Sequence, residues 1–336
     1  MRKPDVSSCV FGAGVLLKNL KAFQEEIEGV RQAEDIEYIH RMRVASRRLR
    51  SALPLFQNCF KKQYRQTWQK DIQAITRALG SARDTDVQID LISQFFSGLE
   101  EEVYKPGIRR LLLRLRQKRL RLQIRVNKAL DRLAKDHLVE TMQKQLQPLA
   151  EKNEQVYLYS PSLYQLSFDA VTVELDHFMS YESFIAKPEC VAELHAMRIA
   201  AKQMRYTLEI FAPLYPGGLK QQLQIMRQIQ DLLGTIHDCD IWGEFLPDFI
   251  TQETRRIQEF YGNKRTVSRL MPGLNAFLAG RQNLRSQKYL EFNDSWNRWK
   301  NDGVWPFLRQ IIQTSFLEAN PQEIEVAAAS TPDTNG

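Results

Sequence analysis

The chain contains one half-chain unit twice, and this duplication constrains the fold more than any other feature of the sequence. The segment HRMRVASRRLRSALPLF begins at His40 and is echoed by HAMRIAAKQMRYTLEIF, which begins at His195. A second shared segment follows in each copy, LGSARDTDV from Leu79 and LGTIHDCDI from Leu233. The offsets are 155 residues (195 minus 40) and 154 residues (233 minus 79), so the two registers agree and the repeat is much longer than that of a solenoid. We therefore expect a body built from two similar halves.

Apolar residues recur at three- and four-residue intervals along nearly the whole chain, which predicts an all-α protein. In the first half we expect helices at about 15–29, 36–56, 61–79, 85–99, 109–133 and 136–147, with breaks at Pro54, Gly80, Gly98 and Pro106-Gly107. In the second half we expect them at 163–184, 189–211, 219–233 and 240–261, with one or two more between 272 and 317.

These helices predict a single domain over residues 10–318. It would consist of two four-helix-bundle-like halves, about 10–150 and 160–318, related by a pseudo-two-fold axis. The segment 148–161 would connect the halves. Residues 320–336 lack a strong apolar pattern, so we expect them to form a disordered tail.

The charge, the cysteines and the apolar runs of the sequence indicate which kinds of protein it can encode. The net charge is +7, with 47 basic and 40 acidic residues, so the distribution of charge matters more than its excess. The four cysteines are far apart and form no CxxC pair, which favours reduced thiols in a cytoplasmic protein without a zinc or redox motif. No run approaches the roughly 20 apolar residues that cross a bilayer, so we expect no membrane insertion.

Each repeated helix has one face for packing and one for charge. At about 100° per residue, the basic positions of the first copy fall on one side, and the second copy repeats them. They are His40, Arg43, Arg47 and Arg50, and then His195, Arg198, Lys202 and Arg205. A basic helix face is commonly just a solvated surface, but these arcs hold no acid, and like charges repel until something negative neutralises them.

Two sources could supply that negative charge, the repeated aspartates and an external anion. The aspartates are Asp84, Asp86, Asp238 and Asp240, and each pair follows a glycine where we expect one helix to end. Their simplest role is to cap the next helix. Alternatively, Asp84 and Asp238 could support the site by holding an arginine in one orientation. In either role they are too few to neutralise every cation.

A third basic row extends the cationic surface over roughly 33 Å of one helix, at about 1.5 Å per residue. It comprises Arg110, Arg114, Lys118, Arg121, Arg125, Lys128 and Arg132, and Lys220 with Arg227 forms a further basic pair. Such a length suits an extended polyanion better than a single phosphate. No aromatic residue interrupts these rows, whereas single-stranded nucleic acids are usually gripped with aromatic platforms. A base-free phosphate polymer therefore fits best, and binding to a nucleic-acid backbone is the alternative.

The repeated segments resemble the CHAD domain family, the conserved histidine α-helical domain. The resemblance rests on the four segments quoted above and covers about residues 10–318. It implies two four-helix bundles with pseudo-two-fold symmetry that bind inorganic polyphosphate, often on granules in bacteria. It also implies that His40, Arg43, Arg47, Arg50, His195, Arg198, Lys202 and Arg205 occupy the family's basic positions. In the second copy, Gln203 replaces the residue that corresponds to Arg48.

Two enzymatic interpretations fit less well. The triphosphate-tunnel barrel that accompanies some members of the family has no room in this chain. The His237-Asp238 pair resembles that of HD-type metal phosphohydrolases, but the first copy has Arg83-Asp84 there, and the five histidines are not spaced as helical metal ligands. We therefore expect a non-enzymatic protein without metal or cofactor.

The expected function is polyphosphate binding in a shared positive groove or pore, in the cytoplasm and on polyphosphate granules. The oligomeric state is left open. Besides the eight family positions, the expected contacts are Arg48, Arg114, Lys118, Arg121, Arg125, Lys220 and Arg227, with Asp84 and Asp238 in support.

Overall fold

The computed structural model describes residues 6–152 and 159–320, and every regular element in these ranges is a helix. The first half contains α1 (Val6–Gln24), α2 (Ile27–Gln32), α3 (Ile36–Leu55), α4 (Lys62–Ser97), α5 (Lys105–Lys135) and α6 (Leu138–Ala150). The second half contains α7 (Pro161–Met179), α8 (Val191–Phe211), α9 (Lys220–Tyr261), α10 (Met271–Asn301) and α11 (Val304–Ala319). The predicted all-α class is confirmed.

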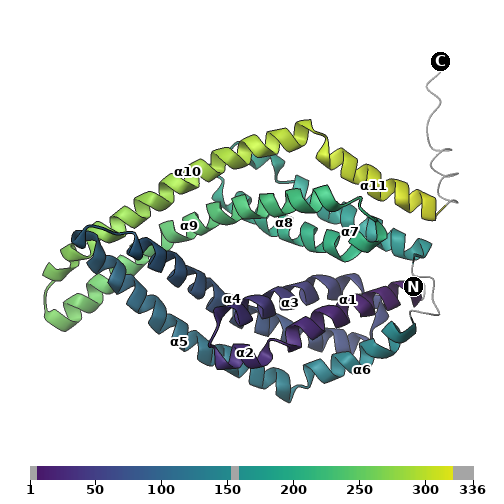
Figure 1. Cartoon of the computed structure of the whole chain (residues 1–336), viewed down its shortest axis with the longest axis horizontal. Coiled ribbons are helices and arrows are strands. Elements are labelled where there is room, and N and C mark those ends of the chain that lie inside the picture. The colour runs from purple at the N-terminus through teal and green to yellow at the C-terminus, as the bar shows by residue number, and fades with distance from the viewer. Residues whose placement is uncertain (1–5, 153–158, 321–336) are drawn as a thin grey trace.

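The same order of neighbours occurs in both halves. In the first half, α3 packs between α1 and α4, α5 packs on α4, and α6 packs on α1. In the second half, α8 packs between α7 and α9, α10 packs on α9, and α11 packs on α7. The halves form the lower and upper layers of Figure 1 and touch through α3 with α8, α1 with α7, and α5 with α10. The two repeated basic helices, α3 and α8, are therefore neighbours.

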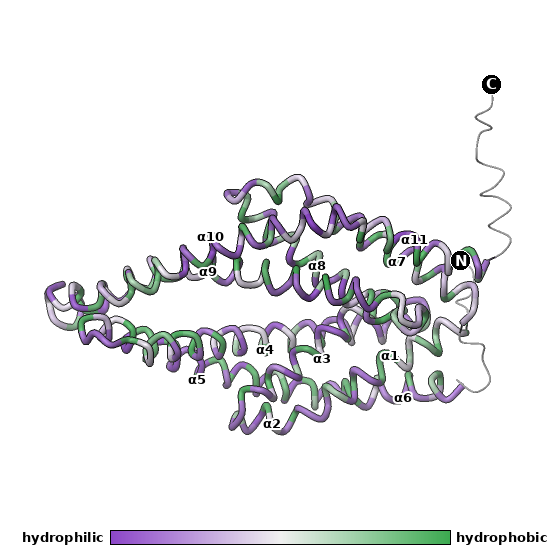
Figure 2. Tube along the Cα trace, turned by 45° about the horizontal axis from the view of Figure 1, so that its top comes forward, coloured by the Kyte–Doolittle hydropathy of each residue, from purple (hydrophilic) through white to green (hydrophobic). Residues whose placement is uncertain are grey.

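Two hydrophobic clusters hold the layers together. The larger one lies in the body and includes residues of both halves, such as Leu49 and Phe211. The smaller one joins α4 and α5 to α9 and α10 at the distal end, where Trp242 packs edge-on against Phe277 with ring centroids 5.0 Å apart. Hydrophobic and hydrophilic residues alternate along the long helices in Figure 2, as expected for helices that bury one face.

Two glycines permit a close crossing at this distal end. A Cβ atom at Gly107, near the start of α5, would overlap the backbone carbonyl of Leu270. A Cβ atom at Gly273, near the start of α10, would overlap the carbonyl of Tyr104. The first turns of α5 and α10 can approach this closely because neither position carries a side chain.

The predicted helix breaks at Gly80 and before residue 240 are wrong. The helix α4 runs through Gly80 and α9 runs through Gly234 without interruption. A glycine inside a helix costs only about 1 kcal/mol, and burial of residues on both sides of Gly80, such as Leu79 and Ala82, outweighs that cost. Other boundaries also move, since α1 begins at Val6 instead of residue 15 and Pro54 lies inside the last turn of α3.

The cysteines differ from the expected set of four thiols. A disulfide joins Cys9 of α1 to Cys59 in the turn after α3, with the two Cα atoms 5.3 Å apart. Cys190 and Cys239 are free. The pairing was not visible in the sequence because 50 residues separate the partners, and only the packing of α1 along α3 brings them together.

One stretch, Val6–Gln32, has the length and apolar composition of a membrane span, contrary to the expectation from the sequence. Half of its apolar window is buried inside the fold. In the structure it forms α1 and α2, and α1 packs on α3 and α6, so its apolar residues serve as core. A core helix and a membrane span share this composition.

The ends of the predicted domain lie partly beyond what the structure describes. Of the tail expected at 320–336, only Asn320 is among the described residues. In the expected connection at 148–161, Pro148 belongs to α6 and Pro161 opens α7, and residues 153–158 are outside the described ranges.

Candidate functional site

The basic rows of α3 and α8 face one another where the two halves meet. We call Arg43 and Arg47 of α3 and Arg198, Lys202 and Arg205 of α8 the central cluster. Burial lowers the pKa of Arg47, and the charges of Arg43, Arg198 and Arg205 lower it further. Burial, followed by Arg198, Arg47 and Arg43, lowers the pKa of Lys202 to about 7. Cations from both copies of the repeat thus share one partly buried space.

The carboxylates around this cluster do not neutralise it. Asp84 of α4 accepts an ion pair from Arg43 with 3.4 Å between Oδ1 and Nη2, and Glu209 lies 3.4 Å from Arg205. Asp238 of α9 opposes the lowering of the Arg198 pKa, while burial raises the pKa of Asp238 itself. Within the described residues, Arg47, Arg198 and Lys202 have no carboxylate at ion-pair distance. Five cations therefore face three carboxylates, one of which is shared with another arginine.

Several buried hydrogen-bond donors of this region also lack partners. In the described part of the chain, no acceptor meets the Nε atoms of Arg43, Arg198 and Arg205, and the Nδ1 atom of His195, which donates or accepts according to the tautomer, also has no partner. An unsatisfied buried donor costs roughly 1–3 kcal/mol. An anion with several oxygens could relieve both this cost and the repulsion between the cations.

Three histidines close to these cations also have lowered pKa values. The ring of His195 on α8 packs at a tilt of 32° against that of His237 on α9, with ring centroids 4.0 Å apart. Burial, Arg198 and Lys202 lower the pKa of His195, and burial, Arg198 and His195 lower that of His237 to about 4. Burial and Arg83 lower the pKa of His40. The neighbouring cations disfavour the charged imidazoles, and phosphate oxygens would favour them.

Nearby carboxylates and histidines do not gather into a metal-ligand set. In the ranges that the structure describes, no three or more His, Cys, Asp or Glu side chains are grouped so that they could hold a metal ion. Arg198 and Lys202 lie close enough to His237 to lower its pKa, and such cations would repel a divalent ion.

The interpretation of the repeated aspartates as helix caps is wrong, because all four lie inside the continuous helices α4 and α9. Their contacts are with arginines. Asp84 contacts Arg43, Asp86 accepts from Arg119 at 2.6 Å, and Asp240 accepts from Arg285 at 2.5 Å. The alternative in which an aspartate orients an arginine therefore agrees with the geometry of Asp84.

Tyr206 is a contact that the sequence reasoning missed. The guanidinium carbon of Arg47 lies 5.5 Å from the centre of its ring, and that of Arg205 lies 5.2 Å away. The ring is buried, with 5% of the residue exposed. It orders two cations of opposite halves through cation–π contacts. Its only signal in the sequence was its position directly after Arg205.

Other predicted contacts border the central cluster or lie apart from it. Arg48 pairs across the halves, at 3.2 Å, with Glu209, which also pairs with Arg205. Together with Arg227, Arg48 lines a cavity of about 540 Å³ that Glu209 and Tyr206 also border. Lys220 is exposed at the start of α9, and Arg50 is exposed on α3. His40 lies near Arg43, since that charge contributes to its lowered pKa.

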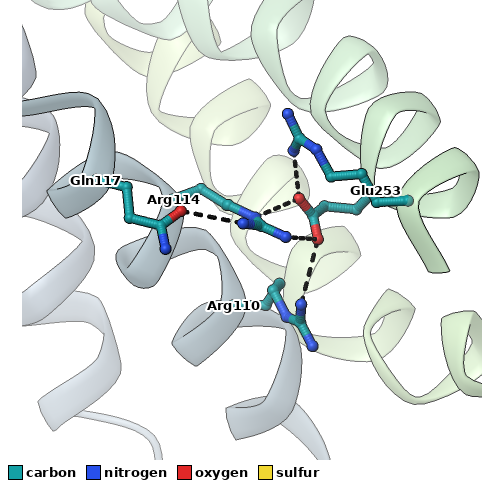
Figure 3. Close-up of polar contacts among 5 residues, drawn as sticks. Arg110, Arg114, Gln117 and Glu253 are labelled. Carbon is teal, nitrogen blue, oxygen red and sulfur yellow. Dashed lines mark hydrogen bonds and ion pairs between the residues drawn. The ribbon is translucent and has the colours of Figure 1, made fainter. Parts of the chain in front are cut away.

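The third basic row, on α5, does not form one continuous ridge. Arg110 and Arg114 are held by the buried carboxylate of Glu253 on α9, with Arg114 Nε 2.6 Å from Oε1 (Figure 3). Lys118 lies within the field of Asp84, which partly opposes the lowering of its pKa by burial. Arg121, Arg125 and Lys128 are exposed, and Arg132 at the end of the row pairs with Asp71 and Asp136. Helical periodicity predicts that these residues lie on one line along α5. In the structure, the residues that contact this line differ from one turn to the next, so only some of its cations are free for a ligand.

Comparison with known proteins agrees with this architecture. The sequence profile of the CHAD domain matches residues 14–247. The CHAD domain from the plant Ricinus communis has a similar structure, with a TM-score of 0.58 and 24% identity over 82% of this chain and 91% of that chain. PptA from Streptomyces chartreusis is also similar, with a TM-score of 0.53 and 14% identity over 85% of this chain and 98% of that one. At these identities the structural likeness concerns the fold. No curated protein matches the sequence.

Proposed function

Because the chain belongs to the CHAD domain family, we propose that it binds inorganic polyphosphate and that the central cluster of α3 and α8 is the binding site. The observation that carries this proposal is the excess of partly buried cations contributed by both halves. Arg47, Arg198 and Lys202 lie together without a carboxylate at ion-pair distance among the described residues. Their mutual repulsion is a cost in the free protein that an anion removes.

The types of side chain favour phosphate. Arginine offers a planar fork of donors that matches two phosphate oxygens, and lysine adds a point charge. The Nε atoms of Arg43, Arg198 and Arg205 are buried and unpaired, so they would donate to phosphate oxygens only once the guanidinium groups turn toward a bound chain. A polymer with one charge on every unit can neutralise all five cations in a single binding event, whereas a lone phosphate cannot reach all of them.

We infer that the halves contribute equivalent rows, related by an approximate two-fold axis, to one shared groove. This inference is supported by the identical order of neighbours in the two halves and by the matched positions of Arg43 with Arg198 and of Arg47 with Lys202. A chain of phosphates lying along this groove would contact α3 on one side and α8 on the other.

A binding role is favoured over catalysis. Asp84 contacts Arg43, and Asp238 lies in the field of Arg198 and Lys202, so these carboxylates balance cations. We propose accordingly that the protein holds polyphosphate without cleaving it. Its location in the cytoplasm on polyphosphate granules stays a prediction, and the Cys9–Cys59 disulfide opposes the reduced thiols on which the cytoplasmic location was based.

A competition experiment tests the identity of the polyanion. Labelled long-chain polyphosphate is bound to the purified protein at physiological salt and displaced by unlabelled polyphosphate, single-stranded nucleic acid or duplex at equal phosphate concentration. The proposal predicts that nucleic acid competes at least tenfold less well, a difference of about 1.4 kcal/mol. Equal displacement by nucleic acid would contradict it and favour binding to nucleic-acid backbones.

A further inference from the structure

A second cationic cavity, of about 620 Å³, lies between α5 and α9 on the distal side of the central cluster. Apolar and cationic residues make up most of its lining. Leu115, Phe245 and Phe249 form an apolar part, and Lys118, Arg121 and Arg256 form a cationic part. The volume lies within the range of roughly 300–1,000 Å³ that is usual for small-ligand sites.

Positive charge exceeds negative charge around this cavity. The side chain of Glu253, only 2% exposed, receives ion pairs from Arg110, Arg114 and Arg256 (Figure 3). Three guanidinium groups thus share one carboxylate. In the described residues, Lys118 and Arg121 have no carboxylate at ion-pair distance, and Asp248 is the one acid in the lining. The cavity is therefore suited to an anion.

The apolar part of the lining contains two stacked phenylalanine rings. The rings of Phe245 and Phe249 stack at 6.1 Å with an interplanar angle of 26°, and Trp242 packs edge-on against Phe245 at 5.5 Å. The ammonium of Lys118 lies 5.8 Å from the centre of the Phe245 ring. The cation thus lies over the aromatic ring, and both line the same cavity. Inorganic polyphosphate has no group that can use an aromatic face, whereas a planar ring can stack on it.

We propose that this cavity is a binding site for a small organic phosphate that carries an aromatic ring, the chemistry of a nucleoside di- or triphosphate. The phosphates contact Lys118, Arg121 and Arg256, and the ring packs on Phe245. The site does not depend on the central cluster, because none of the five cluster residues lines the cavity.

Calorimetric titration with ATP and with inorganic tripolyphosphate, both without metal, separates the two kinds of contact. The titrations are made with the full chain and with its Arg47→Gln, Lys202→Gln variant, which weakens the central cluster. In the full chain tripolyphosphate can also bind at the central cluster, so the two ligands are compared in the double variant, where we expect ATP to bind about tenfold more tightly than tripolyphosphate. Equal affinities for the two ligands in the double variant, or loss of ATP binding in it, would overturn the proposal.

Substitutions at the cavity, made in the Arg47→Gln, Lys202→Gln background, provide the second readout. Phe245→Leu keeps apolar bulk but removes the ring, so it should weaken ATP about tenfold and leave tripolyphosphate unchanged. Arg256→Ala should weaken both ligands, while Glu253 retains Arg110 and Arg114 as partners. Arg255→Ala is the matched control, since Arg255 is on the same helix and pairs with the exposed Glu259. No effect of Phe245→Leu on ATP, or equal effects of Arg255→Ala and Arg256→Ala, would contradict the assignment.

Discussion

The affinity for polyphosphate should fall as the pH rises through 7, because of Lys202. Burial and the charges of Arg198, Arg47 and Arg43 lower the pKa of its ammonium from 10.5 to about 7 in the free protein. Bound phosphate oxygens favour the charged ammonium and raise its pKa again. Binding therefore takes up a proton when the pH is above about 7 and takes up none at Lys202 well below it.

The size of the effect follows from this value. With a pKa of about 7, the charged fraction of free Lys202 falls from roughly nine-tenths at pH 6 to roughly one-tenth at pH 8. If the pKa in the complex stays above this range, the affinity falls about tenfold between these pH values, or about 1.4 kcal/mol. The sign is fixed, because the protonated form is the one that binds.

Fluorescence anisotropy with end-labelled long-chain polyphosphate at constant ionic strength measures this slope. Histidines with lowered pKa, among them His195 and His237, add affinity at low pH, so Lys202→Arg is the essential comparison. A guanidinium stays charged throughout this range, and the variant retains the histidine contribution but should lose the tenfold fall. An equal slope in both proteins, or an affinity that rises with pH, would refute the assignment of Lys202.

Three further predictions concern stability. Glu253→Gln leaves three arginines around a neutral amide; because these arginines are partly exposed, the cost should stay below the about 3–5 kcal/mol of a fully buried pair, but the melting temperature should still drop below that of Glu259→Gln, and similar melting curves would contradict the role of this cluster. Gly107→Ala places a methyl group against the carbonyl of Leu270 and should lower the free energy of unfolding by more than the usual 1 kcal/mol of a point mutation, measured by urea denaturation; unchanged stability would argue against the close crossing. Reduction of the disulfide that closes the 50-residue loop between Cys9 and Cys59 should cost about 4 kcal/mol in the chain-entropy treatment, and an identical urea midpoint for a Cys59→Ser variant would show that the bond is not formed.

The sequence predicted those parts of the structure that depend on local periodicity. The basic and apolar faces of α3 and α8 follow directly from helical spacing, and the duplication indicated that the two helices are equivalent. Arg47 and Lys202 lie close together because α3 packs against α8. A shared site needs this packing, but no pattern in the sequence predicts it. The structure meets this condition for the five residues of the central cluster.

Predictions failed where packing between distant segments decides the outcome. The sequence predicts a helix end at Gly80, but burial of the adjacent residues Leu79 and Ala82 keeps α4 continuous. Glu253 belongs to no recognisable motif, and yet it forms an ion pair with Arg114. From helical periodicity we expect Arg114 to contact a ligand. Cys9 and Cys59 could be paired only after α1 and α3 were placed together. In each case the deciding partner is remote in sequence, so no local pattern could identify it.

The most direct test of the central claim is a comparison of two charge-matched variants in polyphosphate binding. One variant replaces Arg43, Arg47, Arg198 and Lys202 of the central cluster by glutamine. The other replaces Arg109, Arg116, Lys128 and Lys135, which are exposed on α5, and so lowers the net charge by the same amount. The account predicts that the first variant, shown to be folded by its circular dichroism, loses at least a hundredfold in affinity, while the second loses only a fewfold through the long-range field. Equal losses in the two variants would contradict it, because net charge and not the convergence of α3 and α8 would then control binding.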